Sequence, residues 1–273
     1  MNSISANWAA CIVHYQDQLS LRNLVQNLDE QNLKPLAVFI ADNNSDRDIT
    51  LNNYSFPIEI IKLSENKGFA AGANVAIRKA ISKNFENFIL LSQDVILERD
   101  TTEKLLSELN ATKSLVFPTM IDRTKNKIFS KGGTINIYSG AINLCVDEVP
   151  PSPDWADGSC LVFTKELYLS VDGFNEDYFM YFEDVDFCYR AKGLGFKLSH
   201  VETTASQTPR GPSPLLRSKN SVILARRNGP QIFKFSITLR NILGAIKLLL
   251  QFKIKESKNR LTGVILGWSA KID

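Results

Sequence analysis

The sequence predicts an α/β protein with a mostly parallel central sheet and helices on both faces of that sheet. Apolar runs of strand length alternate with segments whose apolar residues recur at helical spacing. The strand-length runs are apolar throughout, which is typical of parallel strands buried on both faces. With 273 residues, 44% of them hydrophobic and 22% charged, the chain can bury one sizeable core and carry an appendage.

The expected elements follow one another along the chain. Strands are expected at residues 9–15, 36–41, 58–63, 88–91, 115–117, 160–163 and 197–201. Helical spacing or capping residues predict helices at 21–28, 69–81 and 100–109, a short one after Thr164, one beginning near Glu183, and a longer one within 231–252. Residues 121–149 are less regular. We therefore divide the chain into an α/β domain, residues 1–228, and a C-terminal helical region, residues 229–273.

Polar side chains gather where the predicted strands end. Residues 42–44 (Asp-Asn-Asn) follow the second strand, 65–66 (Glu-Asn) the third, and 92–94 (Ser-Gln-Asp) the fourth. Turns favour Asp and Asn for conformational reasons, so each position alone has a structural explanation. Ligands of parallel sheets bind beyond the carboxyl ends of the strands, and the joint placement at one edge therefore indicates a site.

Residues 65–77 read ENKGFAAGANVAI and place a run of small residues at the start of a predicted helix. The free N–H groups and the dipole of such a helix suit a phosphate, and Lys67 adds a cation beside it. The segment matches neither the dinucleotide-binding glycine fingerprint nor a Walker loop. Close packing of the helix against its neighbours is the alternative explanation.

The run FMYFEDVDFCYR, residues 179–190, joins aromatic side chains directly to Glu183, Asp184 and Asp186. Ionised carboxylates are costly beside aromatic rings unless a partner compensates them. Acids are also favoured in the first turn of a helix by its dipole. We interpret the run as a helix start, as a site, or as both, and expect Asp186 to pair or cap within the helix.

Five segments together resemble the family 2 glycosyltransferases, most of all the rhamnosyltransferase-like branch. They are ADNNSD (41–46), ENKGFAAGAN (65–74), LLSQDVILERD (90–100), DWADGSCLVF (154–163) and DGFNEDYFMYFEDVDFCYR (172–190). They occur in the family's order, over about residues 9–228. The resemblance implies a GT-A fold, an inverting reaction and a nucleotide-sugar donor, commonly linked to UDP or dTDP.

The resemblance also implies roles for single residues. Asp184 is the general base with Glu183 beside it, and Asp94, the last acid of a DxD motif, holds Mg²⁺ or Mn²⁺ against the donor's diphosphate. The implied nucleotide contacts are Tyr15, Asp42, Asn66, Lys67, Gly72 and Asn74, and the implied donor or acceptor sugar contacts are Asp157 and Gly158. Two positions depart from the family pattern. Ser92 stands at the first DxD acid and Gln207 at a histidine that ligates the metal in relatives, so the metal set is incomplete.

Charge is divided unevenly along the chain. Residues 210–273 contain 13 Lys and Arg against two acids, whereas residues 1–209 carry a net charge of −8. Apolar residues within 231–252 follow helical spacing, but the Lys and Arg between them argue against a membrane-spanning helix. A basic amphipathic helix suits an anionic membrane surface, and packing on its own domain or in a homodimer is the alternative. Nucleic acid is not an expected partner, because no stacking platform or groove-reading motif accompanies the charge.

The expected compartment is the cytoplasm, at the inner face of the plasma membrane. The four cysteines show no CxxC spacing and suit reduced thiols, and the N-terminus lacks the basic region of a signal peptide. We expect a glycosyltransferase that adds one sugar, with rhamnose as a candidate, to a lipid-linked oligosaccharide of a bacterial surface polysaccharide. The alternative is a catalytically silent nucleotide-sugar-binding or scaffold protein of a polysaccharide assembly complex.

Overall fold

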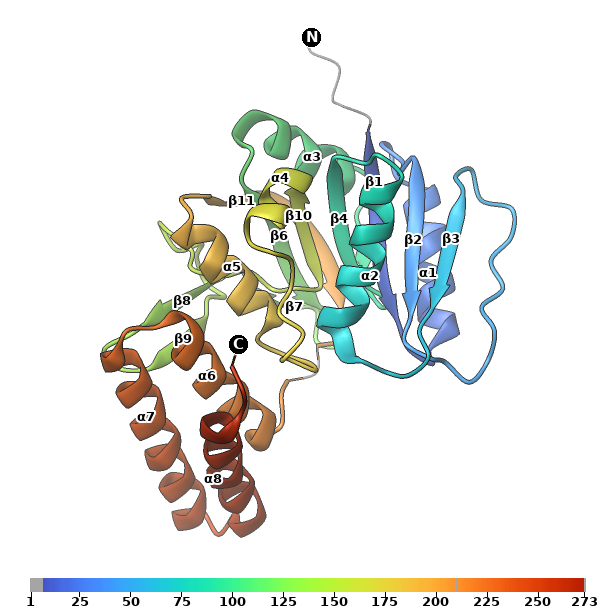
Figure 1. Cartoon of the computed structure of the whole chain (residues 1–273). Helices are drawn as coiled ribbons and strands as arrows, with labels where there is room; N and C mark the ends of the chain where they lie inside the picture. Colours follow the sequence, from blue (N-terminus) through green and yellow to red (C-terminus); the bar gives the residue numbers. More distant parts are fainter. Residues whose placement is uncertain (1–6, 210, 273) are drawn as a thin grey trace.

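A nine-stranded sheet forms the centre of the protein in the computed structural model, which describes residues 7–209 and 211–272 (Figure 1). Its strands are β1 (Trp8–His14), β2 (Ala37–Asp42), β3 (Ile58–Lys62), β4 (Asn87–Ser92), β5 (Ile96–Leu97), β6 (Leu115–Asp122), β7 (Lys127–Ser130), β10 (Cys160–Thr164) and β11 (Leu198–Gln207). Their order is β3-β2-β1-β4-β10-β6-β11-β5, and β7 pairs with β6. The seven expected strands are all present, and the α/β class is confirmed.

The directions of the strands decide which loops meet at the edge of the sheet. β3, β2, β1 and β4 are parallel, in a register that places His14 beside Asp42 and Val13 beside Ser92. β10 runs antiparallel to β4, with Cys160 opposite Leu91, so the sheet is mixed rather than parallel throughout. Because of this reversal, residues 157–159, which precede β10, reach the edge where the parallel strands end.

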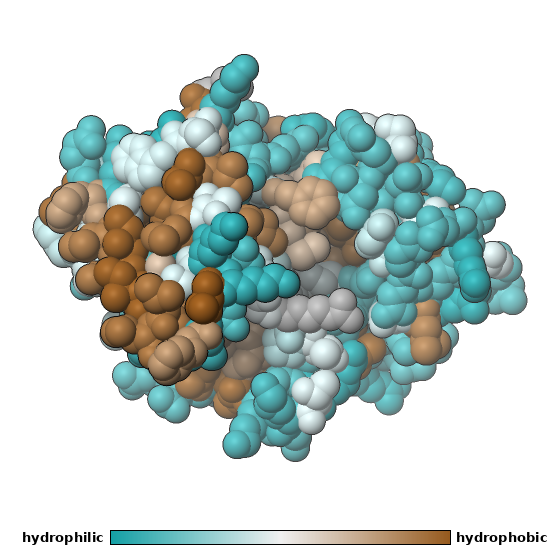
Figure 2. Space-filling model, turned by 90° about the horizontal axis from the view of Figure 1, so that it is seen from below, coloured by the Kyte–Doolittle hydropathy of each residue, from teal (hydrophilic) through white to brown (hydrophobic). Residues whose placement is uncertain are grey.

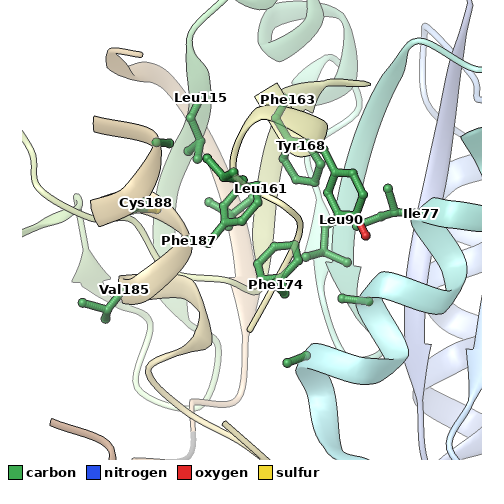
Figure 3. Packing of buried hydrophobic residues seen from close by; sticks show 14 of the residues in the cluster. Ile77, Leu90, Leu115, Leu161, Phe163, Tyr168, Phe174, Val185, Phe187 and Cys188 are labelled. Atoms are coloured by element: carbon green, nitrogen blue, oxygen red, sulfur yellow. The ribbon is translucent and has the colours of Figure 1, made fainter. Parts of the chain in front are cut away.

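Helices cover both faces of the sheet, as expected. α1 (Gln18–Asp29) and α3 (Thr101–Thr112) pack on one face, whereas α2 (Gly68–Ser82), α4 (Lys165–Ser170) and α5 (Glu183–Gly193) pack on the other (Figure 1). Figure 3 shows how aromatic side chains join α5 to the sheet. The ring of Phe187 on α5 lies 4.1 Å from that of Phe174 and 5.2 Å from that of Phe163 on β10, measured between ring centroids. This packing fixes the helix that carries the acids of the 179–190 run.

A second, two-stranded sheet lies between the main sheet and the C-terminal helices (Figure 1). It consists of β8 (Gly133–Asn136) and β9 (Ala141–Leu144), in the segment where the sequence patterns are less regular. The turn between these strands contacts the following helical region, because the Ser236 hydroxyl donates a hydrogen bond to the Ile137 carbonyl oxygen at 2.6 Å. A β carbon at Gly140 would come within 2.7 Å of the backbone at Ser236. The small sheet therefore connects the two parts of the molecule.

Three helices complete the chain: α6 (Pro214–Asn228), α7 (Gln231–Leu250) and α8 (Ile254–Ser269). α7 and α8 extend away from the main sheet (Figure 1). α8 packs closely on α6, since β carbons at Gly263 and Gly267 would come within 2.3 and 2.7 Å of carbonyl oxygens on α6. The proposed boundary at residue 228 stays a prediction, and it falls between α6 and the helix pair that packs with it. Within residues 7–209 and 211–272, none of the helices combines the length and apolar character needed to cross a membrane.

Candidate active site

A cavity of about 680 Å³ opens at the edge where the parallel strands end. It is lined by strand ends on one side and by the C-terminal helices on the other. Of the residues selected from the sequence, seven line it: Tyr15, Asn66, Asp94, Asp157, Gly158, Glu183 and Asp184. Segments up to 170 residues apart in the chain therefore meet at one place, as the placement of polar residues at strand ends suggested.

The end of β1 presents Tyr15 to the cavity. Its backbone is held by the side chain of Gln93, which accepts a hydrogen bond from the Tyr15 N–H at 2.8 Å and donates one to the Tyr15 carbonyl oxygen at 3.1 Å. The preceding residue, His14, is buried but also lines the cavity, and burial lowers its pKa. His14 was not selected from the sequence, and Gln93 appeared there only within the polar group 92–94; both directly adjoin a selected residue.

Asp42 does not line the cavity. Its side chain is buried at the end of β2 and accepts a hydrogen bond from the Ser45 N–H at 3.0 Å, so it shapes the turn. Its neighbour Asn43 reaches the cavity instead. The Asn43 amide donates to the Gly68 carbonyl oxygen at 2.8 Å and accepts from the Lys67 N–H at 3.3 Å. Asn43 thus ties the end of β2 to the start of α2.

The start of α2 is engaged by the protein itself. The Gly68 N–H donates to the Asn66 side chain at 3.0 Å, and the Phe69 N–H donates to the Phe179 carbonyl oxygen at 2.8 Å. Gly68 has φ +87°, and a β carbon there would lie 1.9 Å from the Phe179 carbonyl oxygen, so only glycine fits. Lys67 is half-exposed and lies 3.9 Å from Glu65. Close packing accounts for this segment more completely than an open phosphate cradle does.

Gly72 and Asn74 also have packing roles in the structure. A β carbon at Gly72 would come within 2.7 Å of the Val13 side chain, which shows how closely α2 approaches β1. Asn74 is buried; its amide donates to the Phe174 carbonyl oxygen and to Glu176, both at 2.8 Å. Its carbonyl oxygen accepts from the Phe174 N–H and from the Tyr168 hydroxyl, both at 2.9 Å. All four of its hydrogen bonds join α2 to the 168–176 segment, away from the cavity.

Asp184 lies at the start of α5, and its carboxylate is fixed by two backbone groups. Its Oδ2 accepts from the Gly158 N–H at 2.9 Å, and its Oδ1 accepts from the Val185 N–H at 2.8 Å. Burial, and the charge of Asp157 after it, raise the pKa of Asp184 to about 7. A carboxyl group that is poised near neutral pH in a cavity can accept a proton from a bound hydroxyl.

Two further acids surround Asp184. Glu183 is buried, and burial with the neighbouring Asp184 raises its pKa well above its usual range. Asp157 accepts from the Ser159 N–H at 3.0 Å, and burial together with the charge of Asp94 raises its pKa. Asp94, Asp157, Glu183 and Asp184 therefore form a chain of carboxyl groups that repel one another along the cavity wall.

The backbone before Asp184 is strained. Tyr181 and Phe182 have φ angles of 69° and 75°, a region that non-glycine residues rarely adopt. The Asn220 amide on α6 supports this turn by donating to the carbonyl oxygens of Met180 and Tyr181 at 3.0 and 2.8 Å. The strained turn lets α5 begin at the cavity wall with both acids in its first turn.

Asp186 has the structural role expected from the sequence. It is fully buried and lies 2.7 Å from the Arg190 guanidinium. It also accepts hydrogen bonds from Asn228 at 2.6 Å and from the Tyr178 hydroxyl at 3.3 Å. This pairing anchors α5 to the end of α6, so Glu183 and Asp184 are the acids of the 179–190 run that line the cavity.

Comparison with known proteins identifies the family. The model of glycosyl transferase family 2 matches residues 9–151, which is more than half of the chain. The chain belongs to glycosyl transferase family 2. The hexosyltransferase Agl10 of low-salt glycan biosynthesis in Haloferax volcanii is 24% identical over 196 residues, which is 66% of this chain and 60% of the relative. Rhamnosyltransferase WbbL of Escherichia coli is 40% identical over 48 residues, 18% of each chain. The chain thus spans less than two thirds of either relative.

Solved structures of low sequence identity share the fold of this family 2 chain. GalNAc-T7 with UDP, GalNAc and Mn²⁺ aligns with a TM-score of 0.67 at 12% identity, over 86% of this chain and 50% of the other. S. aureus TarS 1-349 aligns at 0.62 with 14% identity, over 96% and 80%. Mannosyltransferase PcManGT from Pyrobaculum calidifontis, in complex with GDP-Man and Mn²⁺, aligns at 0.57 with 13% identity, over 97% and 76%. The fold is GT-A, as the resemblance implied.

The motifs of family 2 did not reveal the far wall of the cavity. That wall carries Arg217 on α6, Arg240 on α7 and Arg260 on α8. Their convergence depends on how three helices pack, and the sequence shows only that the region is basic.

Proposed function

We propose that this family 2 chain is an inverting glycosyltransferase that moves one sugar from a nucleotide-sugar donor to a hydroxyl group of an acceptor. The observation that carries the proposal is the placement of Asp184. Its carboxylate is fixed by the N–H groups of Gly158 and Val185, its pKa is about 7, and it lines the same cavity as Tyr15 and Asp94. A carboxylate base fixed beside a ligand-sized cavity fits a one-step displacement.

The proposed reaction forms one bond and breaks one. The acceptor oxygen attacks the anomeric carbon of the donor sugar as its proton passes to the Asp184 carboxylate. The bond from that carbon to the diphosphate oxygen breaks, and its electron pair leaves with the nucleoside diphosphate. Because attack comes from the face opposite the leaving group, the configuration inverts. Base catalysis of this kind contributes typically about 10²- to 10⁴-fold to a rate.

Donor binding is assigned to the strand-end side of the cavity. Tyr15 and Asn66 line it there, and we propose UDP or dTDP as the nucleotide. Lys67 directly follows Asn66 in the sequence and its side chain is half-exposed, so it can reach an anionic ligand bound beside Asn66. Asp42, Gly72 and Asn74 act through packing, by shaping the turn and the helix that carry the lining residues. Asp157 and Gly158, at the start of β10, are proposed to face the transferred sugar.

We propose that a divalent ion accompanies the donor, because two structural neighbours are described with Mn²⁺. Among the residues that the structure describes, no group of three or more His, Cys, Asp and Glu side chains is arranged to hold a metal. Asp94 lines the cavity and lies within electrostatic reach of Asp157, and hard oxygen donors such as its carboxylate suit Mg²⁺ and Mn²⁺. We propose that Asp94 would hold the ion beside the donor's diphosphate. Bound there, the ion would stabilise charge on the departing diphosphate.

The acceptor and the location are inferred from the C-terminal helices. Large apolar side chains on α7, on α8 and in the turn between them face solvent, including Phe235, Leu243, Leu250, Phe252 and Ile265, which are 56 to 90% exposed. Figure 2 shows this apolar surface over the helical part of the molecule. The same region is strongly basic, which suits an anionic membrane surface. We propose peripheral binding at the cytoplasmic face of the membrane, with a lipid-linked glycan as acceptor and rhamnose as a candidate sugar.

Donor screening followed by turnover tests this function. Thermal shifts with UDP-, dTDP- and GDP-sugars identify the nucleotide, since a ligand stabilises in proportion to its affinity. We expect nucleoside diphosphate release with the matching donor and Mn²⁺, and a loss of at least about 100-fold for Asp184→Asn. Donor binding by that variant should persist.

The second candidate is the silent scaffold, which is favoured by the lack of a three-ligand metal group among the described residues. Donor binding without release of nucleotide for any donor or acceptor, with or without Mn²⁺, would support the scaffold and contradict the enzyme.

A further inference from the structure

Three arginines from three different helices meet at one wall of the cavity. Arg217, Arg240 and Arg260 all line it, although they are separated by up to 43 positions in the chain. Burial, followed by the charges of Arg217 and Arg240, lowers the pKa of Arg260, so Arg260 lies within electrostatic reach of both other arginines. No ion pair to any of the three is found among residues 7–209 and 211–272. Like charges gathered without an acid are unfavourable unless an anion joins them.

Arg260 is held in place by the fold. Its Nε donates to the Asn241 side-chain oxygen at 3.2 Å. Asn241 is buried and donates in turn to the Ser221 hydroxyl at 3.0 Å and to the Ile237 carbonyl oxygen at 2.9 Å. The guanidinium lies across Gly244 on α7, where a β carbon would come within 2.2 Å of the Arg260 Cζ. The fold thus leaves space for this side chain and orients it toward the cavity.

The arginines lie beside apolar surface. Ile142 and Leu144 of β9 and Ile237 of α7 line the same cavity. Outside it, the exposed apolar side chains of α7 and α8 continue on the same helices that carry Arg240 and Arg260. Figure 2 shows a hollow with apolar surface on the side of these helices and hydrophilic surface on the opposite side. A ligand with an anionic group and a long apolar chain matches this combination.

We propose that Arg217, Arg240 and Arg260 bind the phosphate or diphosphate group of a lipid-linked acceptor, whose apolar chain lies along the exposed face of α7 and α8. The inference rests on the proposed function for the identity of the ligand as acceptor. Guanidinium groups suit phosphate oxygens because their N–H donors form paired hydrogen bonds.

The geometry favours the acceptor over the donor as the source of this anion. The arginines come from α6, α7 and α8, whereas the residues assigned to the donor follow β1, β3 and β4. Asp184 lines the same cavity as both groups, so a sugar hydroxyl can approach the base while the phosphate end is held by the arginines. The site would then select acceptors by the distance between the phosphate and the reacting hydroxyl.

Calorimetric titration of the full chain tests this site. The probe is farnesyl diphosphate, with farnesol and inorganic pyrophosphate as partial ligands, and the matching nucleoside diphosphate is titrated in parallel. We expect Arg217→Gln, Arg240→Gln and Arg260→Gln each to weaken farnesyl diphosphate binding about tenfold or more. Binding of the nucleoside diphosphate should change less than twofold. Lys247→Gln and Lys258→Gln are matched controls, because they remove the same charge from exposed positions of α7 and α8 that do not line the cavity.

Gly244→Ala provides a variant that keeps every charge. The added methyl group displaces the Arg260 guanidinium while favouring the helical backbone, so the fold should persist. We expect a loss of farnesyl diphosphate affinity like that of Arg260→Gln, with an unchanged circular dichroism spectrum.

Several results would overturn the site. Equal losses in the lysine controls would show a general charge effect, and equal losses of nucleoside diphosphate affinity would show a donor site. Farnesyl diphosphate binding that is absent while the nucleotide binds would remove this site and leave the proposed function standing. Conversely, arginine-dependent binding in a protein that turns over no donor would remove the proposed function and leave the anion site standing.

Discussion

The two neighbouring acids at the start of α5 are treated differently by the fold. The Asp184 carboxylate accepts hydrogen bonds from two backbone N–H groups, which favour its ionised form and hold its raised pKa to about 7. Glu183 is buried, and its Oε2 has no hydrogen-bond partner in the described part of the chain. Its pKa is raised well above the usual range, mainly by burial, which disfavours its ionised form. This difference makes Asp184 the better base.

The pH dependence of turnover follows from the state of Asp184. The group is active when ionised and its pKa is about 7, so kcat/KM should rise about tenfold per pH unit below pH 7 and level off above it. Asp157→Asn should move the midpoint to lower pH, because it removes the charge that, after burial, raises this pKa most. The measurement is kcat/KM for the acceptor at saturating donor, as a function of pH from 5 to 9.

Glu183→Gln is the control for this assignment. It removes the more deeply buried acid and keeps its shape, so the acidic limb should remain with a midpoint near 7. A profile that becomes flat in Glu183→Gln, with the limb intact in Asp184→Asn, would show that Glu183 is the base.

At the residue scale, the sequence indicated the types of functional residue at the site. It was a poorer guide to which individual side chains line the cavity. Asp42 and Asn43 are adjacent residues where β2 ends, yet Asn43 lines the cavity while the Asp42 carboxylate accepts a hydrogen bond within the turn. Asn74 looks like a ligand contact in a motif, yet four internal hydrogen bonds use its whole amide. His14 gave no signal beyond its place at the end of a strand. Side-chain direction depends on packing partners that are remote in sequence.

At the scale of elements, the site depends on a loop and a helix that nearly touch. The 157–159 segment reaches Asp184 because β10 runs antiparallel to β4. The apolar run of β10 predicted a strand, but it carried no information on direction, which the long connection before it determines. The start of α5 was better indicated, because three acids in a first turn match the helix dipole. Its contact with Gly158 needed the structure.

Gly158→Ala tests this contact. An added β carbon would lie 2.8 Å from the Asp184 Cβ, so the loop or the start of α5 must move by several tenths of an ångström. We expect kcat to fall at least about tenfold, because a misplaced base catalyses poorly. The loss of stability should be about 1–3 kcal/mol, as is typical of overpacking. Steady-state kinetics and urea unfolding give the two values.

Gly193→Ala, at the other end of α5, is the matched control. No atom lies within 4 Å of a β carbon there, so activity and stability should both be retained. Normal kcat in Gly158→Ala would show that the spacing between the loop and Asp184 is not critical.

At the scale of the whole molecule, the C-terminal helices present most of their apolar side chains outward. The apolar residues expected at helical spacing within 231–252 include Phe235, Leu243 and Leu250, and all three are exposed, whereas Phe233 and Ile237 pack inward. Sequence periodicity found the amphipathic helix but did not show that a different face packs on the protein. α7 thus has two apolar faces, and one of them has no partner in the described structure. The basic residues around that face favour its contact with an anionic membrane over its exposure to water.

Removal of residues 229–273 would be a poor test of membrane binding, because α8 packs on α6 through Gly263 and Gly267 and its loss would bare that surface. Substitution on the exposed face avoids this problem. In a combined variant with Leu243→Gln, Leu250→Gln, Phe252→Gln and Ile265→Gln, the packed face stays intact, so the melting temperature should be unchanged. Sedimentation with phosphatidylglycerol vesicles should weaken at least about tenfold, since each large apolar side chain removed from water contributes about 1.5–3 kcal/mol when fully buried.

The control for this variant lies on the α/β domain, where Leu19→Gln and Leu36→Gln replace side chains that are 70% and 51% exposed. Vesicle binding by this control should match the wild type, because neither residue belongs to the basic helical region. Light scattering separates the membrane from the homodimer that the same apolar face could form. If the wild type is a dimer and the four-residue variant is a monomer that still binds vesicles, then the face joins two copies of the chain and the membrane contact lies elsewhere. If the wild type is a monomer, and vesicle binding is weakened by the four substitutions at residues 243–265 but not by the Leu19 and Leu36 control, then the membrane contact lies on the C-terminal helices. The cavity, with its base and its arginines, would then lie at the lipid surface.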